Sequence, residues 1–194
     1  MGAISKAWIV ALALLVASCG KAPPNFQGID VTGADWGRDF SLRDPDGQVR
    51  KLADFRGKFV LLFFGYTTCP DVCPTALARA LEVRKLLGQK GSMLQVIFVT
   101  VDPERDTPAL LRDYTSAFDA SFLGLYGNPA ETASATKEFK VFVEKIPTNG
   151  TYTVNHTALS YVFDPSGRLR LVEQHTLGAD AVAADLRKLM RESS

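Results

Sequence analysis

Two continuous apolar runs set the fold class of this 194-residue chain. The first spans 59–64 (Phe-Val-Leu-Leu-Phe-Phe), and the second spans 94–101 (Leu-Gln-Val-Ile-Phe-Val-Thr-Val). A strand without polar alternation is buried on both faces, which is typical of a sheet covered by helices. The segment 74–87 between them has leucines at near-helical spacing and ends before Gly88. The sequence therefore predicts a strand–helix–strand unit with a right-handed crossover.

The remaining segments extend this unit into one mixed α/β domain. Two turn signatures, at 44–47 (Asp-Pro-Asp-Gly) and 164–167 (Asp-Pro-Ser-Gly), each lie between short segments that we expect to pair as a β-hairpin. Further helices are expected at 108–118, 131–144 and 179–190, and a polar, flexible loop at 147–155. The order of these elements resembles a thioredoxin-like fold with an extra N-terminal β-hairpin and an inserted loop.

Charge excludes one class of partner. The chain has 22 Lys and Arg residues against 21 Asp and Glu, which gives a net charge of +1. It has no basic run and no basic cluster interleaved with aromatic residues, so we expect no nucleic-acid partner. Apolar residues make up 46% of the chain, which is enough for an ordinary globular core.

The first residues predict export. Lys6 precedes an apolar run at 7–17, which ends just before Cys19. This pattern is typical of a secretory signal, and the run is too short to span a bilayer, which takes about 20 residues. The Val-Ala-Ser sequence before Cys19 resembles the lipobox of bacterial lipoproteins; cleavage nearby without lipid, or an uncleaved anchor, are the alternatives. We expect a signal peptide at 1–18, a tether from a lipidated Cys19 at 19–38, and a folded domain at 39–192 on the periplasmic side of a bacterial membrane.

The two other cysteines, Cys69 and Cys73, follow the first apolar strand directly. Open α/β sheets place their ligands at the carboxyl ends of strands. Cys73 falls in the first turn of the next helix, where the helix dipole favours a thiolate. The spacing of four presents both sulfurs on one side, which suits either a reversible disulfide or two metal ligands. Two buried small hydrophobic residues would be the simplest alternative, and redox thioredoxins use the tighter Cys-x-x-Cys.

A histidine would complete a metal site with these sulfurs. Thiolates and imidazole suit copper and zinc, but structural zinc takes four protein ligands and only three soft candidates exist. The chain has two histidines. His156 lies between the predicted flexible loop and a strand, from where it can swing toward the cysteines, whereas His175 follows the last strand. By pattern alone, each histidine is more often a structural or surface residue than a ligand.

Three sequence blocks resemble the Sco/SenC family of copper-handling proteins. They are 65–74 (Gly-Tyr-Thr-Thr-Cys-Pro-Asp-Val-Cys-Pro), 101–108 (Val-Asp-Pro-Glu-Arg-Asp-Thr-Pro), and 154–157 (Val-Asn-His-Thr) ahead of 161–167 (Tyr-Val-Phe-Asp-Pro-Ser-Gly). The resemblance implies a thioredoxin-like fold whose inserted loop carries the ligand histidine. It implies a copper site made of Cys69, Cys73 and His156. Many relatives carry an acidic residue before that histidine, where this chain has Asn155.

The resemblance also implies a function, which is delivery of copper to the CuA centre of cytochrome c oxidase subunit II or to another copper acceptor. The cargo is expected as Cu(I) and also as Cu(II). Such a metallochaperone is a binding and transfer protein rather than an enzyme. Its thiols must be reduced to bind metal, so copper capture and disulfide state are coupled.

A thiol–disulfide reductase that keeps the acceptor's metal-binding cysteines reduced is the alternative, and it needs only Cys69 and Cys73. Other copper chaperones and thioredoxin-like reductants are further expected partners. A peroxide-reducing thiol enzyme is a third, weaker reading. Thioredoxin-type oxidoreductases place a cis-proline before the strand that faces their cysteines. The sequence has no proline at His156-Thr157, which favours the metallochaperone.

Overall fold

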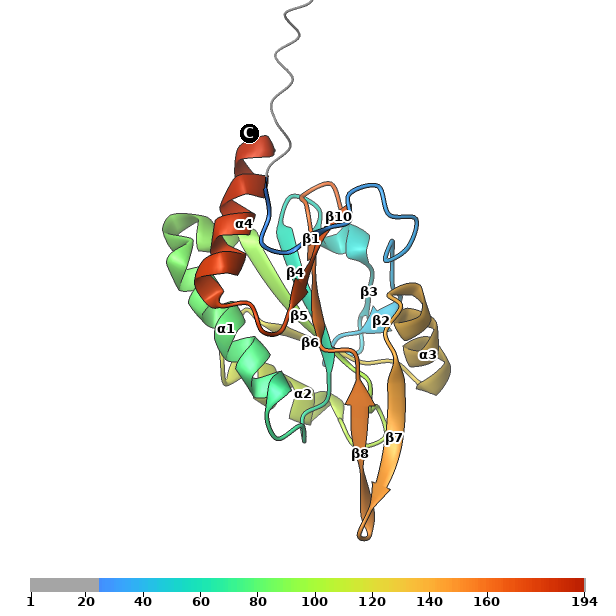
Figure 1. Cartoon of the computed structure of the whole chain (residues 1–194). Coiled ribbons are helices and arrows are strands. Elements are labelled where there is room, and N and C mark those ends of the chain that lie inside the picture. Colours follow the sequence, from blue (N-terminus) through green and yellow to red (C-terminus); the bar gives the residue numbers. More distant parts are fainter. Residues whose placement is uncertain (1–24, 194) are drawn as a thin grey trace, which may run out of the picture.

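The computed structural model describes residues 25–193, so the predicted signal peptide and Cys19 lie outside the described residues. Its centre is a six-stranded sheet in the order β1-β10-β9-β4-β5-β6 (Figure 1). The strands of this sheet are β1 (Ile29–Asp30), β4 (Phe59–Gly65), β5 (Leu94–Thr100), β6 (Leu123–Leu125), β9 (Leu159–Phe163) and β10 (Leu169–Gln174). Two separate hairpins are formed by β2 (Leu42–Arg43) with β3 (Val49–Arg50), and by β7 (Val143–Thr148) with β8 (Thr151–His156). The helices are α1 (Val72–Leu86), α2 (Pro108–Ser116), α3 (Pro129–Glu138), α4 (Ala179–Glu192) and the short 3-10 turns η1 (Leu52–Phe55) and η2 (Gly88–Met93).

The two apolar runs form the middle of the sheet, as predicted. β4 and β5 pair in parallel from Phe59 opposite Leu94 to Gly65 opposite Thr100, and all seven residues of β4 are buried. β9 pairs with β4 in antiparallel orientation. On its other side, β9 pairs with β10, again in antiparallel orientation. Parallel strands buried on both faces need helices on both sides. The mixed α/β architecture of the thioredoxin-like prediction is confirmed, as is the extra N-terminal hairpin.

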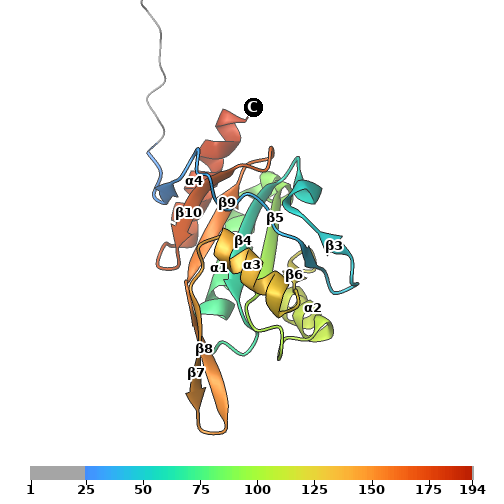
Figure 2. The same cartoon turned by 90° about the vertical axis from the view of Figure 1, so that its right-hand side faces the viewer.

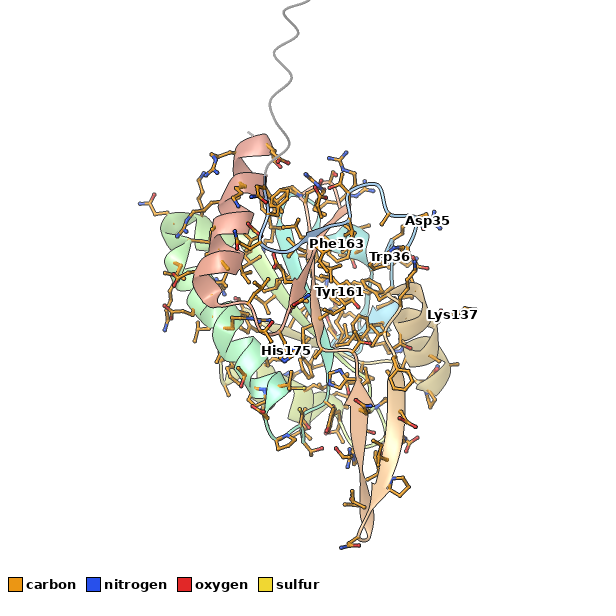
Figure 3. All side chains as sticks on the ribbon, viewed as in Figure 1. Asp35, Trp36, Lys137, Tyr161, Phe163 and His175 are labelled. Carbon is orange, nitrogen blue, oxygen red and sulfur yellow. The ribbon has the colours of Figure 1, made fainter. Side chains whose placement is uncertain are left out.

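Helices cover both faces of the sheet. α1 and α4 lie side by side on one face (Figure 1), and α3 lies over the opposite face (Figure 2). Phe139, at the end of α3, reaches the sheet, and its ring centroid lies 5.2 Å from that of Phe64 and 5.4 Å from that of Tyr161. Tyr161 also donates a hydrogen bond from its hydroxyl to the Phe139 carbonyl at 3.0 Å, and Figure 3 shows it in the middle of the domain.

Helix α3 is shorter than predicted. Its start is set by Asn128, whose side chain accepts from the Glu131 amide at 2.9 Å, while the Glu131 carboxylate accepts from the Asn128 amide at 2.8 Å. Its end comes at Glu138, and Lys140 adopts a left-handed backbone conformation with φ of 54°. The prediction of a helix to residue 144 is wrong because the chain turns there and enters β7 at Val143.

The predicted flexible loop at 147–155 is also wrong. These residues form most of a regular antiparallel hairpin, paired from Val143 opposite His156 to Thr148 opposite Thr151. The turn is Asn149-Gly150, with Gly150 at φ of 77°, a left-handed conformation that glycine adopts without strain. The hairpin projects from the body of the domain (Figure 1), and His156 is the last residue of β8. The inserted segment that carries the histidine is therefore a hairpin.

The domain begins before residue 39. β1 pairs with β10 through Ile29 and Asp30. Ahead of it, the backbone amides of Gln27 and Gly28 donate to the Asp185 carboxylate of α4 at 2.6 and 2.8 Å. Within residues 25–193, none of the helices has both the length and the apolar character needed to cross a membrane.

Candidate metal centre

The two cysteines lie at the junction between β4 and α1. The chain leaves β4 at Gly65, and the Cys69 amide donates to the Tyr66 carbonyl at 3.2 Å, which closes a tight turn ahead of the helix. Cys73 occupies the first turn of α1 and is fully buried, whereas Cys69 is partly exposed. Both cysteines are free thiols. The turn thus presents one accessible sulfur and one that faces the interior.

The hairpin brings His156 to the buried sulfur. His156 Nε2 lies 3.8 Å from Cys73 Sγ, although the two residues are 83 positions apart in the sequence. The other ring nitrogen, Nδ1, lies 3.1 Å from the Thr157 carbonyl, which can only accept a hydrogen bond. Nδ1 therefore carries the proton, and the Nε2 lone pair is directed at the sulfur. The structure thus places His156 beside the second cysteine of the motif.

Two aromatic rings hold the imidazole. The Phe63 and Tyr66 ring centroids lie 6.1 and 5.9 Å from that of His156, both in edge-to-face geometry. Burial lowers the pKa of His156, and the hydrogen bond to the Thr157 carbonyl offsets this only in part. The imidazole is therefore neutral at physiological pH, as a metal ligand must be.

Cys73 behaves differently from the sequence-based expectation of a thiolate. Burial raises the pKa of the Cys73 thiol well above its ordinary range, and the nearby Cys69 and Asp106 raise it further. A hydrogen bond from the Tyr66 backbone acts in the opposite direction but is the weaker influence. The local effect of the helix N-terminus is thus outweighed by removal of the sulfur from water. In the metal-free protein Cys73 is a protonated thiol that faces the lone pair of His156.

His175 is not part of this arrangement. It lies in the connection between β10 and α4 (Figure 3). Its side chain is exposed, and its carbonyl accepts from Arg79 Nη1 at 2.5 Å. Within residues 25–193, no group of three or more His, Cys, Asp or Glu side chains is already arranged as a metal-binding cluster. The structure assembles Cys73 with His156 and leaves Cys69 beside them on the turn.

The loop between β5 and α2 is hydrogen-bonded to the cysteine turn through Asp106. Asp106 is buried, and its carboxylate accepts from the Thr67 hydroxyl at 2.6 Å and from the Thr100 hydroxyl at 2.5 Å. The Thr67 amide also donates to it, at 3.1 Å. The residues just ahead of Cys69 are therefore fixed to the end of β5.

The same loop also holds the hairpin. Asp102 is fully buried and accepts from the Tyr152 hydroxyl at 2.7 Å and from Arg105 Nε. Arg105 Nη1 in turn donates to the Tyr152 carbonyl at 2.8 Å, and its guanidinium lies 3.9 Å from the centre of the Tyr152 ring. Sequence analysis singles out the 101–108 block only as part of the family resemblance. Its charged residues are the signal that could have revealed this second role.

Comparisons with known proteins agree with the geometry. The SCO1/SenC family model matches residues 30–191. The SCO2-like protein of Rickettsia felis is 35% identical over 137 residues, which cover 68% of this chain and 66% of that protein. The structure of Bradyrhizobium japonicum ScoI with copper bound has 42% identity and a TM-score of 0.72, covering 80% of this chain and 99% of that one. The solution structure of apo Sco1 from Thermus thermophilus also has 42% identity, with a TM-score of 0.77, covering 87% and 99%.

These matches extend over nearly all of the folded domain, although this chain spans just under two thirds of the length of the curated Rickettsia relative. The matched region of 30–191 includes β1, the cysteine turn, the β5–α2 loop and the β7–β8 hairpin. The chain belongs to the SCO1/SenC family.

Proposed function

We propose that this protein is a metallochaperone that binds copper through Cys69, Cys73 and His156 and delivers it to the CuA centre of cytochrome c oxidase subunit II. The observation that carries the proposal is the contact between Cys73 and His156. A neutral imidazole directs its Nε2 lone pair at a buried sulfur 3.8 Å away, across 83 residues of sequence. Two sulfurs and one imidazole are the donor set that Cu(I) prefers.

Copper binding replaces protons. Each thiol loses its proton to solvent as its sulfur becomes a thiolate ligand, while the neutral imidazole of His156 binds without losing a proton. Because burial raises the pKa of Cys73, the proton competes strongly with the metal at this sulfur. Copper affinity is therefore expected to rise with pH. The partly exposed Cys69 is the sulfur from which an acceptor's thiolate can take over the ion by ligand exchange.

The relatives support the choice of metal. Bradyrhizobium japonicum ScoI is described with copper bound, and it is 42% identical to this chain over a match that covers 99% of it. The choice of cytochrome c oxidase subunit II as the acceptor rests on the Sco/SenC resemblance. Another copper protein or a second copper chaperone could take the ion by the same ligand exchange. Reduced cysteines are required throughout, so a thioredoxin-like reductant is a further expected partner.

The alternative function is a thiol–disulfide reductase, and it is favoured by the unequal exposure of the two sulfurs. A partly exposed Cys69 beside a buried Cys73 matches an attacking thiol and a resolving thiol. This chemistry would move two electrons from the cysteine pair to an acceptor disulfide and leave Cys69 and Cys73 joined. It does not use His156.

We further propose that the protein is exported and held on the periplasmic side of a bacterial membrane by lipid on Cys19. Support comes from the apolar run at 7–17 and the small residues before Cys19. Mass spectrometry of the N-terminus of the mature protein tests this directly. An unmodified Cys19, or cleavage at another bond, would rule out the lipid anchor.

An anaerobic Cu(I) titration of the reduced full chain separates the two functions. The wild type is expected to bind one equivalent, and Cys69→Ser, Cys73→Ser and His156→Ala should each weaken that binding by at least about tenfold, the loss expected for one ligand. His175→Ala is the matched control because it removes the other histidine of the chain, whose side chain is exposed. A wild type that binds no copper, yet reduces a disulfide substrate at a rate unchanged by His156→Ala, would show that the chaperone proposal is wrong.

A further inference from the structure

We propose that Tyr66 is the positioning residue that couples the three candidate copper ligands, and that its hydroxyl ties the β7–β8 hairpin to the cysteine turn. This inference rests on the proposed function for its copper readout, but the tie itself exists in the metal-free protein. Tyr66 follows β4 directly and is 3% exposed. It lies between the cysteine turn and the β7–β8 hairpin, which together carry the three candidate ligands.

The backbone of Tyr66 contacts both cysteines. Its carbonyl accepts from the Cys69 amide at 3.2 Å, which sets the turn. Its own backbone also forms a hydrogen bond to Cys73. Any displacement of Tyr66 along the chain therefore shifts both sulfurs.

The side chain of Tyr66 contacts the hairpin. Its ring lies edge-to-face with the His156 imidazole, at 5.9 Å between centroids. Its hydroxyl lies 3.0 Å from the Thr153 hydroxyl, and the Val154 amide donates to it at 3.5 Å. Oη accepts from the Val154 amide and also forms a hydrogen bond with Thr153 Oγ1, in which either hydroxyl can donate. One phenol thus meets β8 two and three residues before His156.

Other contacts also hold the hairpin, and apart from the Cys73–His156 contact they start outside the cysteine turn. At its base, the Thr157 amide donates to the Phe142 carbonyl at 3.1 Å. Farther along β8, Tyr152 is held by Asp102 and Arg105 of the β5–α2 loop. Apart from the Cys73–His156 contact of the candidate site itself, Tyr66 is the residue that links the cysteine turn to β8 among the contacts described for this hairpin. Loss of its hydroxyl should therefore free His156 to leave the sulfurs while the fold stays intact.

The test uses the full chain with Tyr66→Phe, which removes one oxygen and keeps the ring. Tyr161→Phe is the matched control, because it also removes a buried tyrosine hydroxyl bond, at 3.0 Å to Phe139, on a strand outside the hairpin. In the metal-free protein, hydrogen exchange of the β8 amides should speed up roughly three- to tenfold in Tyr66→Phe, as expected for one lost hydrogen bond. Tyr161→Phe should leave the β8 amides unchanged. Equal exchange in wild type and Tyr66→Phe, or an equal increase in the control, would overturn the proposal.

A reciprocal variant, Thr153→Val, removes the partner on the hairpin side. If the two hydroxyls act as a pair, the double variant should exchange no faster at β8 than Tyr66→Phe alone. Additive effects would show that Tyr66 does not act through Thr153, and the tie would be refuted. This measurement needs no copper, so it stands even if the titration shows that the proposed function is wrong.

The copper readout then links the tie to the site. In Tyr66→Phe the Cu(I) stoichiometry should stay at one equivalent, while transfer to a competing chelator becomes faster by about the same factor as the exchange. The nitrogen hyperfine coupling of the Cu(II)-loaded protein should weaken in Tyr66→Phe and stay unchanged in Tyr161→Phe, because only the first variant loosens the imidazole. An unchanged transfer rate together with an unchanged nitrogen coupling would show that Tyr66 is a core residue without a positioning role.

Discussion

A Cβ atom on Gly65 would lie 2.7 Å from Cys73 Sγ, so the last residue of β4 must be a glycine for Cys73 to occupy its buried position. The same Cβ would lie 2.8 Å from Phe98 and 3.0 Å from Phe63. Phe63 also contacts the His156 ring, so no neighbour can yield without disturbing the candidate site.

Gly65→Ala is therefore expected to damage both stability and the site. Overpacking of this kind typically lowers the free energy of unfolding by about 1–3 kcal/mol, and displacement of Cys73 should weaken Cu(I) binding. Chemical denaturation and the Cu(I) titration measure the two effects. Gly178→Ala is the control, because a Cβ there meets nothing within 4 Å. Copper binding that stays at the wild-type level would contradict the assigned position of the Cys73 sulfur.

The two cysteines should differ in reactivity. Cys69 is partly exposed, whereas Cys73 is fully buried and burial raises its pKa. Alkylation proceeds through the thiolate, so iodoacetamide at pH 7.5 should label Cys69 at least about tenfold faster than Cys73. Mass spectrometry of peptides from a time course gives both rates. In denaturant the rates should converge, and faster labelling of Cys73 in the native protein would be inconsistent with its burial.

Stability should fall as pH rises through neutrality because of Glu173. This side chain is fully buried and, among residues 25–193, neither carboxylate oxygen has a hydrogen-bond partner. Burial, and then the nearby Asp185, raise the pKa of Glu173 from 4.5 to about 7, while Arg79 and Lys188 oppose the shift. The folded state therefore binds the proton more tightly than the unfolded state does. The resulting stabilisation is complete below about pH 4.5 and is lost as pH rises through about 7.

Glu173→Gln isolates this contribution, since glutamine resembles the protonated acid. The variant should match the wild type near pH 4.5 and exceed its free energy of unfolding by up to roughly 3 kcal/mol at pH 8.5. Denaturation curves at both pH values provide the measurement. The exposed Glu144→Gln serves as the control and should show no such difference. If the difference in free energy of unfolding between the wild type and Glu173→Gln is the same at both pH values, Glu173 does not cause the effect.

The pairing of Asp102 with Arg105 should matter more than the surface ion pair beside it. Asp102→Asn removes the charge of a buried acceptor that serves both Arg105 and Tyr152, so unfolding should become easier by about 1–3 kcal/mol. Glu104 forms an exposed ion pair with Lys145 at 2.8 Å, and Glu104→Gln should change stability by less than about 1 kcal/mol. Chemical denaturation gives the change in the free energy of unfolding for each of the two variants. Limited proteolysis at the Asn149-Gly150 turn shows how firmly the hairpin is held in each. Equal effects of the two substitutions would refute the ranking.

The centre of the fold could be predicted from the sequence because its signals are local and strong. β4 and β5 are continuous apolar runs, and the capping residue of α2, Thr107, accepts from the Leu110 amide at 3.2 Å as its position before Pro108 indicates. The sequence predicts a loop at 147–155 instead of the β7–β8 hairpin, because this stretch is mostly polar. Most of the hairpin's residues are exposed. Its order comes from cross-strand pairing and from the loop that holds Tyr152, and hydropathy reports neither.

The site could be predicted only in part. The spacing of Cys69 and Cys73 and the family blocks indicate the candidate ligands, and the structure places Cys73 and His156 in contact. The protonation of Cys73 could not be foreseen, because the sequence shows its place at a helix N-terminus but not its complete burial. The role of Tyr66 also escaped sequence reasoning, since its hydroxyl partner, Thr153, lies 87 positions away.

The point at which the chain joins the domain fixes the direction in which the protein can present its cargo. The first described residues lie beside α4, at the end opposite the β7–β8 hairpin and the start of α1 (Figure 1). If Cys19 carries the proposed lipid, the described chain is attached at the end of the domain opposite the elements that bear the candidate ligands. An acceptor that approaches from the side away from that point of attachment would meet the hairpin and the start of α1 first.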